Sequence, residues 1–339
     1  MEPGGPAARA AEGLRFLGRL PNRVDGKMSG LSAGGIRKGQ GRGSVTPRVS
    51  FEFFPPATPQ LVRQFWSVMD RLAPLAPDFV SITYGAGGRT RKRTHEMVVA
   101  VKQRTSIEPA AHLTCVGASR EEIHDILERY WQAGIRHLVA LRGDPPSGSS
   151  AFVPHPLGYA GAVDLVADIH AFADFEISVA AHPEGHPDST SLKADLDHLK
   201  RKEAAGASRA ITQYFFDPEV FLRFRDQAIR AGIRMPLVPG ILPVTDFGQL
   251  QRISARCGAR VPPWLEQLFA GLDQEPETGR LVGAHVTAGL CQDLLREGVE
   301  AFHFYTLNRA ELTRAVCRFL GVSEKPLRPE NRPAATLHD

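Results

Sequence analysis

Short apolar runs alternate with longer amphipathic stretches from Val49 to near the end of the chain. The runs are rich in β-branched and aromatic residues, which favours strands, whereas the longer stretches repeat apolar positions at helical spacing. The predicted strands are 49–54, 79–84, 108–114, 137–143, 177–183, 209–216, 236–242 and 301–307. The predicted helices are 59–73, 90–104, 119–133, 160–172, 191–205, 217–231, 246–257, 277–297 and 310–320, with a shorter one near 262–270.

This alternation predicts an α/β protein with a parallel sheet, and the count of eight strands favours a (β/α)8 TIM barrel. A doubly wound open sheet is the alternative. The local signals agree with the periodicity: the helix at 119–133 opens with a capping-box pattern, Ser119 to Glu122, and ends at Gly134.

We predict three segments. Residues 1–48 are rich in Gly, Ala, Arg and Pro without a sustained period, so we expect a disordered basic N-terminal arm. We expect residues 49–321 to form the barrel domain and residues 322–339 to form a disordered C-terminal tail.

The net charge of +4 is unevenly distributed. The arm holds nine Lys/Arg and three Asp/Glu and so carries +6, which leaves −2 for the rest of the chain. A nucleic-acid-binding domain would carry a basic patch on its own body, so we expect no nucleic-acid partner for the barrel. A role of the arm in docking on nucleic acid or on an acidic partner stays open.

Other bulk features favour a cytoplasmic enzyme. No apolar run approaches the roughly 20 residues of a membrane helix, and the first residues lack the apolar core of a secretory signal. Four cysteines lie far apart without C-x-x-C spacing, which indicates reduced thiols and neither a disulfide framework nor a zinc knuckle.

The stretch Val49–Pro56 is the first candidate for chemistry. As a strand it directs Ser50, Glu52 and Phe54 to one side and the other apolar residues to the opposite side. A carboxyl group among bulky apolar neighbours loses solvation, so we expect a raised pKa for Glu52, as suits a general acid near neutral pH. The same stretch is equally compatible with a strand-edge Glu that faces water.

Polar residues recur where the predicted strands end. A barrel enzyme gathers its functional groups at the carboxyl ends of its strands, so this placement supports an active site there. The residues are Glu52, Thr83, Tyr84, His112, Thr114, Arg142, Gly143, Asp144, His182, Glu184, Gln213, Gly240, Asn308 and Arg309.

Two motifs allow more than one interpretation. His182, Glu184 and His186 could hold a metal in a barrel hydrolase, but the intervening Pro and Gly predict a loop, in which the shared helical face of a zinc motif is lost. A phosphate or cofactor contact is the other interpretation. Asp195, His198, Arg201 and Lys202 form one polar stripe on a helix, which is either a solvated face or a contact for a diphosphate.

Several motifs taken together resemble the bacterial 5,10-methylenetetrahydrofolate reductases. In chain order they are Ser50–Pro56, Thr83–Ala86, His112–Cys115, Leu141–Asp144, His186–Pro187, Ile211–Gln213, Pro239–Ile241 and His303–Arg309. The resemblance runs from about Val49 to Gly321. Rossmann-type, P-loop and serine-hydrolase motifs are missing, which agrees with this assignment.

The resemblance implies a flavin enzyme that reduces 5,10-methylenetetrahydrofolate to 5-methyltetrahydrofolate with electrons from NADH or NADPH, in one-carbon metabolism and methionine biosynthesis. It implies a ping-pong mechanism, in which nicotinamide and folate use the same flavin face in turn. Glu52 matches the general acid, and Asp144 matches the acidic residue near flavin and pterin. Thr83, Asp144, Gln213, Gln249 and Arg309 match substrate contacts.

The resemblance also implies bound FAD and a homo-oligomer. The matching FAD positions are Thr83, Tyr84, His112, Arg142, Gly143, Asp144, Tyr159, Ala160, His182, His186, Asp195, His198, Arg201 and Lys202. Three positions depart from the family pattern: His182 and His198 stand where some relatives have Tyr and Asn, and Ile253 stands where an aromatic residue can cover the nicotinamide.

Overall fold

The computed structural model describes residues 46–84, 90–144 and 152–325. Its strands are β1 (Arg48–Phe53), β2 (Val80–Ile82), β3 (Pro109–Thr114), β4 (His137–Leu141), β5 (Glu176–Ala181), β6 (Arg209–Thr212), β7 (Leu237–Val238), β8 (Gly240–Ile241) and β9 (Ala301–Tyr305). Its α-helices are α2 (Pro59–Leu72), α3 (Arg91–Arg104), α4 (Arg120–Gln132), α5 (Ala162–Phe172), α6 (Leu192–Ala204), α7 (Pro218–Arg230), α8 (Phe247–Cys257), α9 (Pro263–Phe269), α10 (Pro276–Arg296) and α11 (Glu311–Phe319). Two short 3₁₀ turns, η2 (Ala73–Leu75) and η4 (Leu272–Gln274), complete the elements.

The strands form one parallel sheet that closes on itself. Their order is β7-β6-β5-β4-β3-β2-β1-β9-β8. The two end strands are consecutive pieces of one segment: β7 pairs with β6 through Ile211 and Val238, and β8 pairs with β9 through Gly240 and His303. Pro239, which lies between the two pieces, has no N–H for a ladder, and its carbonyl oxygen accepts a hydrogen bond from His303 N (3.0 Å).

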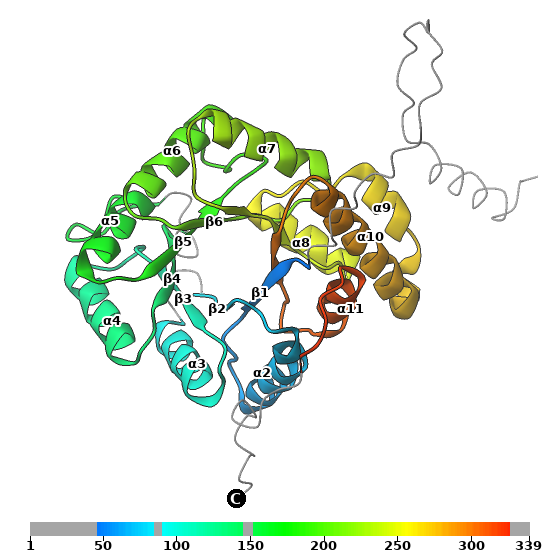
Figure 1. Ribbon diagram of the computed structural model, residues 1–339, viewed down its shortest axis with the longest axis horizontal. Coiled ribbons are helices and arrows are strands. Elements are labelled where there is room, and N and C mark those ends of the chain that lie inside the picture. Colours follow the sequence, from blue (N-terminus) through cyan, green and yellow to red (C-terminus); the bar gives the residue numbers. More distant parts are fainter. Residues whose placement is uncertain (1–45, 85–89, 145–151, 326–339) are drawn as a thin grey trace, which may run out of the picture. The chain divides into compact units, whose positions relative to one another are not determined.

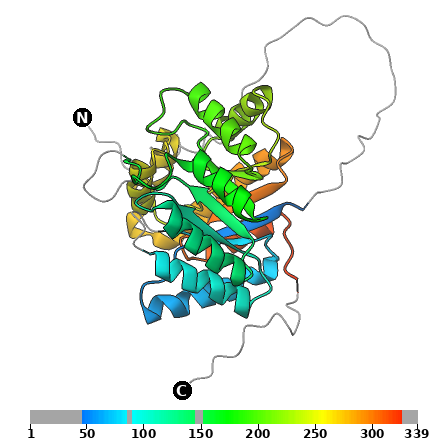
Figure 2. The same ribbon diagram turned by 90° about the vertical axis from the view of Figure 1, so that its left-hand side faces the viewer.

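The closed ring confirms the predicted (β/α)8 TIM barrel and excludes the open doubly wound sheet. Figure 1 shows the strands in the centre and the helices around them, and in Figure 2 helices α4, α5 and α6 cover the outer face of the strands behind them. The predicted start and end of the helix at 119–133 are also confirmed: Ser119 caps α4 with a complete capping box, and Gly134 after this helix has φ +75°.

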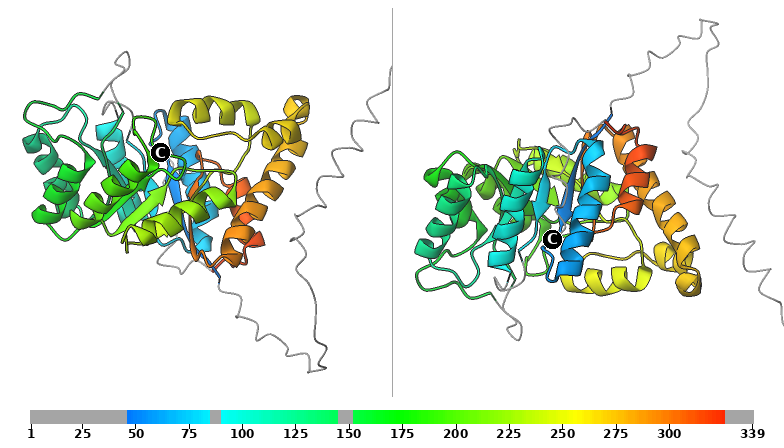
Figure 3. Two further views of the ribbon diagram at one scale, coloured as in Figure 1. Left: turned by 90° about the horizontal axis from the view of Figure 1, so that it is seen from above. Right: turned by 90° about the horizontal axis from the view of Figure 1, so that it is seen from below.

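Three helices, rather than one, separate β8 from β9. Helix α10 packs against α7 and α11, so it occupies the place of an outer barrel helix. Helix α8 lies at one end of the barrel (Figure 3). There Tyr214, which follows β6, donates or shares hydrogen bonds with Ser254 and Cys257 of α8 (2.9 and 3.2 Å). The insertion therefore brings a helix to the carboxyl ends of the strands.

The two sides of β1 differ as predicted. Phe51 and Phe53 point outward into the core between sheet and helices, where Phe53 packs on Phe65 of α2 with ring centroids 5.2 Å apart. Ser50 and Glu52 point into the barrel. Buried polar side chains occupy much of that interior, namely Ser50, Ser81, His112, His137, Ser178 and His303.

The chain divides between Ser44 and Val45, and the second unit contains the whole barrel. The predicted disorder of the arm concerns residues that, up to 45, lie outside the described part. Beyond Gly321 the described chain continues to Lys325: Val322 is buried, and Lys325 N donates to Pro74 O (2.7 Å). The rest of the predicted C-terminal tail lies outside the described residues.

Candidate active site

The carboxyl end of β1 is held by the loop that follows β9. Thr306 donates hydrogen bonds to the carbonyl oxygen of Glu52 from its N (3.3 Å) and its Oγ1 (2.6 Å). The side chain of Asn308 accepts from Phe54 N (2.9 Å) and donates to Phe54 O (3.0 Å). Leu307 and Asn308 adopt positive φ, which turns this loop toward β1. The loop after β9 thus holds the backbone of β1 at Glu52 and at Phe54.

Two histidines, one from β3 and one from β9, flank the Glu52 carboxylate inside the barrel. His112 Nε2 of β3 lies 3.3 Å from Glu52 Oε2, and His303 Nε2 of β9 lies 3.8 Å from the same oxygen. The Glu52 side chain is 16% exposed. It is therefore enclosed but reachable from the end of the barrel, as a proton donor to a bound molecule requires.

The raised pKa expected for Glu52 is wrong. Burial does raise the pKa of this carboxyl, but the nearby imidazoles of His112 and His303 lower it by more, to about 2. The sequence shows the apolar neighbours of Glu52 along β1 but not the imidazoles, which arrive from strands far away in the chain. The carboxylate form is thus favoured in the resting protein.

Most residues predicted to bind FAD form one group beside the carboxyl ends of β4 and β5. His182 and His186 rings pack edge to face with centroids 4.6 Å apart. Asp195 of α6 accepts from His186 N (3.0 Å), and His198 Nδ1 lies 3.1 Å from Arg201 Nη2. Lys202 Nζ donates to Ala180 O of β5 (2.9 Å). The predicted polar stripe of α6 therefore meets the loop after β5, as the diphosphate interpretation requires.

Several basic side chains in this cluster have lowered pKa values. Burial, reinforced by neighbouring positive groups, lowers the pKa of His182 to about 3 and that of His198 to about 4. Burial also lowers the pKa of Lys202 to about 8, although Asp195 opposes this shift. An anion placed here would favour the charged forms of all three side chains, so the cluster suits a phosphate-bearing ligand.

The end of β4 lies against the same cluster. Arg142 Nη2 donates to Asp188 Oδ2 in the β5–α6 loop (2.8 Å). Gly143 has φ +87°, and a Cβ there would lie 2.6 Å from Val116 and 2.9 Å from Thr114. Only glycine fits this turn. Asp144, the second predicted carboxylate, is exposed directly after it.

The remaining predicted flavin residues lie at two further places. Thr83 and Tyr84 follow β2, where Thr83 N donates to Phe53 O (2.9 Å) and ties this loop to β1. Tyr159 is fully buried, and its hydroxyl donates to Asp168 (2.6 Å), so its side chain packs within the fold. Ala160 is exposed next to it, and its N donates to Asp164 (3.1 Å).

Two observations support a polar cofactor here. His112 Nε2 and Thr114 Oγ1, both near the end of β3, are buried and have no hydrogen-bond partner among the described residues. Buried polar atoms normally have partners. Glu52 lies 3.3 Å from His112 Nε2, so it is Thr114 Oγ1 that indicates a bound polar group. Together with the basic cluster, the residues present fit a dinucleotide such as FAD.

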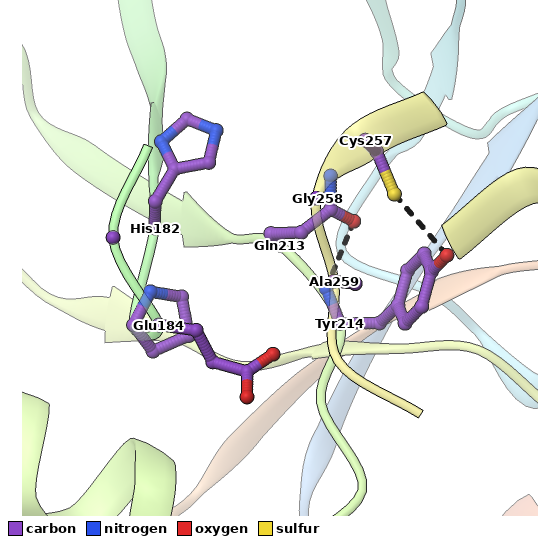
Figure 4. Close-up of a pocket in the computed structure, with 9 residues that line it drawn as sticks. His182, Glu184, Gln213, Tyr214, Cys257, Gly258 and Ala259 are labelled. Carbon is purple, nitrogen blue, oxygen red and sulfur yellow. Dashed lines mark hydrogen bonds between the residues drawn. The ribbon is translucent and has the colours of Figure 1, made fainter. Parts of the chain in front are cut away.

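A small pocket that is open to solvent adjoins this cluster between the β5–α6 loop and the end of α8. Figure 4 shows Gln213 at its centre, with His182 on one side and Tyr214 on the other. Gln213 Oε1 accepts from Tyr214 N (3.0 Å), which orients the amide within the pocket. Gln249, at the start of α8, donates its backbone N to Asp246 (2.7 Å). Arg309 donates to Thr245 Oγ1 (2.8 Å).

The metal-site alternative gains no support. Glu184 Oε2 accepts from Arg260 N (2.9 Å) in the loop after α8, and Figure 4 shows its carboxylate directed away from His182. Among the described residues, no group of three or more His, Cys, Asp or Glu side chains could hold a metal ion. Within this part of the chain no helix is both long and apolar enough to cross a membrane.

The sequence interpretation missed His303 and Asp188 as site residues. His303 pairs in register with Ser50, and its position on the last strand, two residues before Tyr305, places both on the barrel-facing side. The signal was thus present in the alternation of that strand. Asp188 left no such signal, because its contact with Arg142 depends on the path of a loop.

A family model described as methylenetetrahydrofolate reductase matches residues 40–321. The chain belongs to the methylenetetrahydrofolate reductase family. It is 52% identical to the 5,10-methylenetetrahydrofolate reductase of Escherichia coli (strain K12) over 274 residues. This match covers 81% of this chain and 90% of the E. coli protein. It is 43% identical over 273 residues to the protein of the same name from Buchnera aphidicola subsp. Schizaphis graminum. That match covers 80% of this chain and 91% of the Buchnera protein.

Similarity extends to a plant member of the reductase family. The maize protein methylenetetrahydrofolate reductase (NADH) 1 is 37% identical over 287 residues, covering 81% of this chain but 48% of the maize protein. Among solved structures, a Clostridium thermocellum protein described as binding two copies of 5-methyl-5,6,7,8-tetrahydrofolic acid superposes with a TM-score of 0.55 at 14% identity, covering 82% of this chain and 95% of that one. This last likeness concerns the fold alone.

Proposed function

We propose that this member of the reductase family reduces 5,10-methylenetetrahydrofolate to 5-methyltetrahydrofolate with electrons from NADH or NADPH. The proposal rests on the family assignment and on one observation of the structure. Glu52, the residue that matches the family's general acid, lies at the carboxyl end of the barrel with two imidazoles within 4 Å of its carboxylate. It can therefore receive and pass on a proton at the end of the barrel where ligands of this fold bind.

We propose FAD as the bound cofactor. Arg142, His186, Arg201 and Lys202 would hold its diphosphate, and Gly143 would let the backbone approach it closely. The bound flavin supplies hydride transfer, which protein side chains do not perform by themselves. Thr114 would satisfy its buried hydroxyl oxygen against it.

The protein's own part is to bind folate, orient it and supply a proton. Gln213 and Gln249 would contact the substrate, and Arg309 would meet its carboxylates. Asp144 would stabilise positive charge that develops on the pterin and one-carbon unit. Because nicotinamide and folate would use this same region, we propose that they occupy it in turn, which is a ping-pong mechanism.

Glu52→Gln tests the assignment. Glutamine keeps the shape of the side chain but cannot donate a carboxylic proton. We expect the variant to fold, to bind FAD and to be reduced by nicotinamide, while reoxidation by methylenetetrahydrofolate slows by at least about 100-fold. Stopped-flow absorbance of the flavin measures the two half-reactions separately.

Glu96→Gln is the matched control, because Glu96 lies on α3 and pairs with Lys92 at the surface (3.9 Å). It should leave both half-reactions unchanged. A Glu52→Gln variant that reduces folate at the wild-type rate would show that the acid is another group. A protein that neither contains flavin nor takes it up would contradict the proposed function itself.

A further inference from the structure

The two histidines beside Glu52 are held differently. His303 is 0% exposed and both of its ring nitrogens are occupied: Nδ1 lies 2.8 Å from Ser50 Oγ, and Nε2 lies 3.5 Å from Ser81 Oγ as well as 3.8 Å from Glu52. Phe79 stacks on its ring with centroids 5.6 Å apart. Burial lowers the pKa of His303, so its ring is neutral and fixed in place.

His112 is less committed. Its Nε2 is buried and makes no hydrogen bond of good geometry with a described residue. The same nitrogen lies 3.3 Å from Glu52 Oε2, which is ion-pair distance without hydrogen-bond alignment. The side chain as a whole is 9% exposed, whereas His303 has no exposed surface. A small rotation would align Nε2 with the carboxylate.

We propose that His112 carries the proton that Glu52 delivers to the folate, so that the two side chains share one proton and act as a single acid. This inference rests on the proposed function. In the resting pair the proton is on His112 Nε2 and Glu52 is a carboxylate. When folate binds, the His112 N–H bond breaks as the Glu52 O–H bond forms. The Glu52 O–H bond then breaks as the N–H bond on the folate forms.

The step leaves His112 neutral and Glu52 charged, and a proton from solvent restores the pair. The Glu52 side chain, which is 16% exposed, gives that proton access. This arrangement explains how a carboxyl group that is ionised in the resting protein can still act as an acid. Its proton is held on His112 Nε2, which lies 3.3 Å from Glu52 Oε2.

The groups around His112 make Glu52 the decisive partner. His137 of the adjacent strand β4 and His303 of β9 lie near it, Arg209 of β6 lies near both of these histidines, and Tyr305 of β9 faces Glu52. Burial raises the pKa of Tyr305 well above its usual range, so it contributes no charge. The other groups are neutral or positive. Glu52 is thus the one carboxylate of this set that favours an imidazolium at His112.

The direct test is a pH titration of the histidine ring nitrogens by NMR in the full-length protein as purified. Wild type is compared with Glu52→Gln, and His112→Gln identifies the His112 signal. We expect the pH at which His112 takes up its proton to fall by at least about one unit in Glu52→Gln, which is a tenfold loss of proton affinity. An unchanged titration would overturn the proposal.

Kinetics provide the second test. In His112→Gln we expect the rate of the folate step, relative to flavin reduction, to fall at least about tenfold, and the remaining rate to lose its dependence on the shared proton in the pH profile. His137→Gln, a buried histidine of the same interior that does not contact Glu52, should keep the wild-type ratio and profile. An equal fall in both variants would indicate a merely structural role and overturn the proposal.

The proposed function and the proton shared by His112 and Glu52 can be disproved independently. If wild type reduces no folate, the proposed function is wrong, while the NMR comparison still shows whether Glu52 sets the protonation of His112. If folate is reduced but the His112 titration does not depend on Glu52, then only the shared proton is wrong.

Discussion

Burial acts on Glu52 and His137 inside the same barrel with different results. For Glu52, burial raises the pKa, but two imidazoles reverse the shift and lower it to about 2. For His137, burial lowers the pKa to about 3, and nearby Arg209 and histidines add to the shift. Partners rather than burial alone decide which form of a buried group the fold prefers.

His137 should make the protein sensitive to acid. Its pKa is about 3 in the folded protein and near 6.5 in the unfolded chain, so between these values the unfolded chain binds a proton that the folded protein does not. Stability should therefore fall as the pH drops from about 6.5 toward 3, by up to about 1.4 kcal/mol per pH unit from this residue. His137→Gln removes this contribution, and its unfolding free energy should fall less steeply between about pH 6.5 and 4.5.

Urea denaturation at several pH values measures this slope. Glutamine can keep the hydrogen bond that His137 Nε2 shares with Ser178 Oγ (2.8 Å). His285→Gln, at an exposed site on α10, controls for the loss of one histidine. The same slope in His137→Gln as in wild type would mean that this ring is protonated inside the fold.

The closure of the barrel depends on five residues, 237–241, which complete the ring between β6 and β9. At Gly240 a Cβ would lie 2.1 Å from Thr212 O and 2.6 Å from the Tyr305 ring. Because Thr212 O is backbone and also accepts from Tyr305 Oη (2.7 Å), neither neighbour can move freely. Gly240→Ala should lower the unfolding free energy by about 2 kcal/mol or more.

Gly289 provides the matched comparison. It lies within α10, and a Cβ there meets nothing within 4 Å. Gly289→Ala should stabilise the protein by up to about 1 kcal/mol, because alanine favours the helix. Chemical denaturation of both variants decides the matter, and a Gly240→Ala protein as stable as wild type would contradict the tight closure described here.

The sequence predicted the positions of helices and strands better than it predicted where each of them ends. The predicted strand 209–216 ends at Thr212, although Tyr214 and Phe216 continue the apolar pattern. These two side chains pack in a second core with Leu250 of α8 and Phe269 of α9. Apolar character reports burial but not the surface that provides it, so a loop under an inserted helix resembles a continued strand.

The barrel is complete without the N-terminal arm. Its first strand begins at Arg48, whose N donates to Glu300 O (2.8 Å) and whose guanidinium pairs with Asp78 (3.1 Å). A chain of residues 45–339 should therefore keep the melting temperature and the folate reduction rate of the full-length protein. Calorimetry and steady-state assays test this, and a large loss of either would assign the first 44 residues to the fold or the site. Binding to a polyanion such as heparin, measured at low and high salt, separately tests the arm as a docking segment.

The barrel topology predicted from the whole sequence already indicated much of the candidate site. A parallel barrel places the carboxyl ends of its strands at one end, so Glu52, Asp144 and Gln213 could be assigned to one region before any coordinates. The β5–α6 loop and the stripe of α6 were likewise expected to meet, and Asp195 does bond the backbone of His186. Loop contacts such as Arg142 with Asp188 could not be predicted, because loop paths follow no periodic pattern.

The sequence alone determined the alternation of strands and helices, the barrel, and the face of β1 that carries Glu52. These features follow from local periodicity, which neighbouring residues encode. Only the tertiary structure decided the closure at Pro239 and the protonation of Glu52. Both depend on residues brought together from distant strands: His112 and His303 lie 60 and 251 positions along the chain from Glu52. Electrostatic interactions act through space, so the charge of a buried side chain is set only when the barrel closes around it.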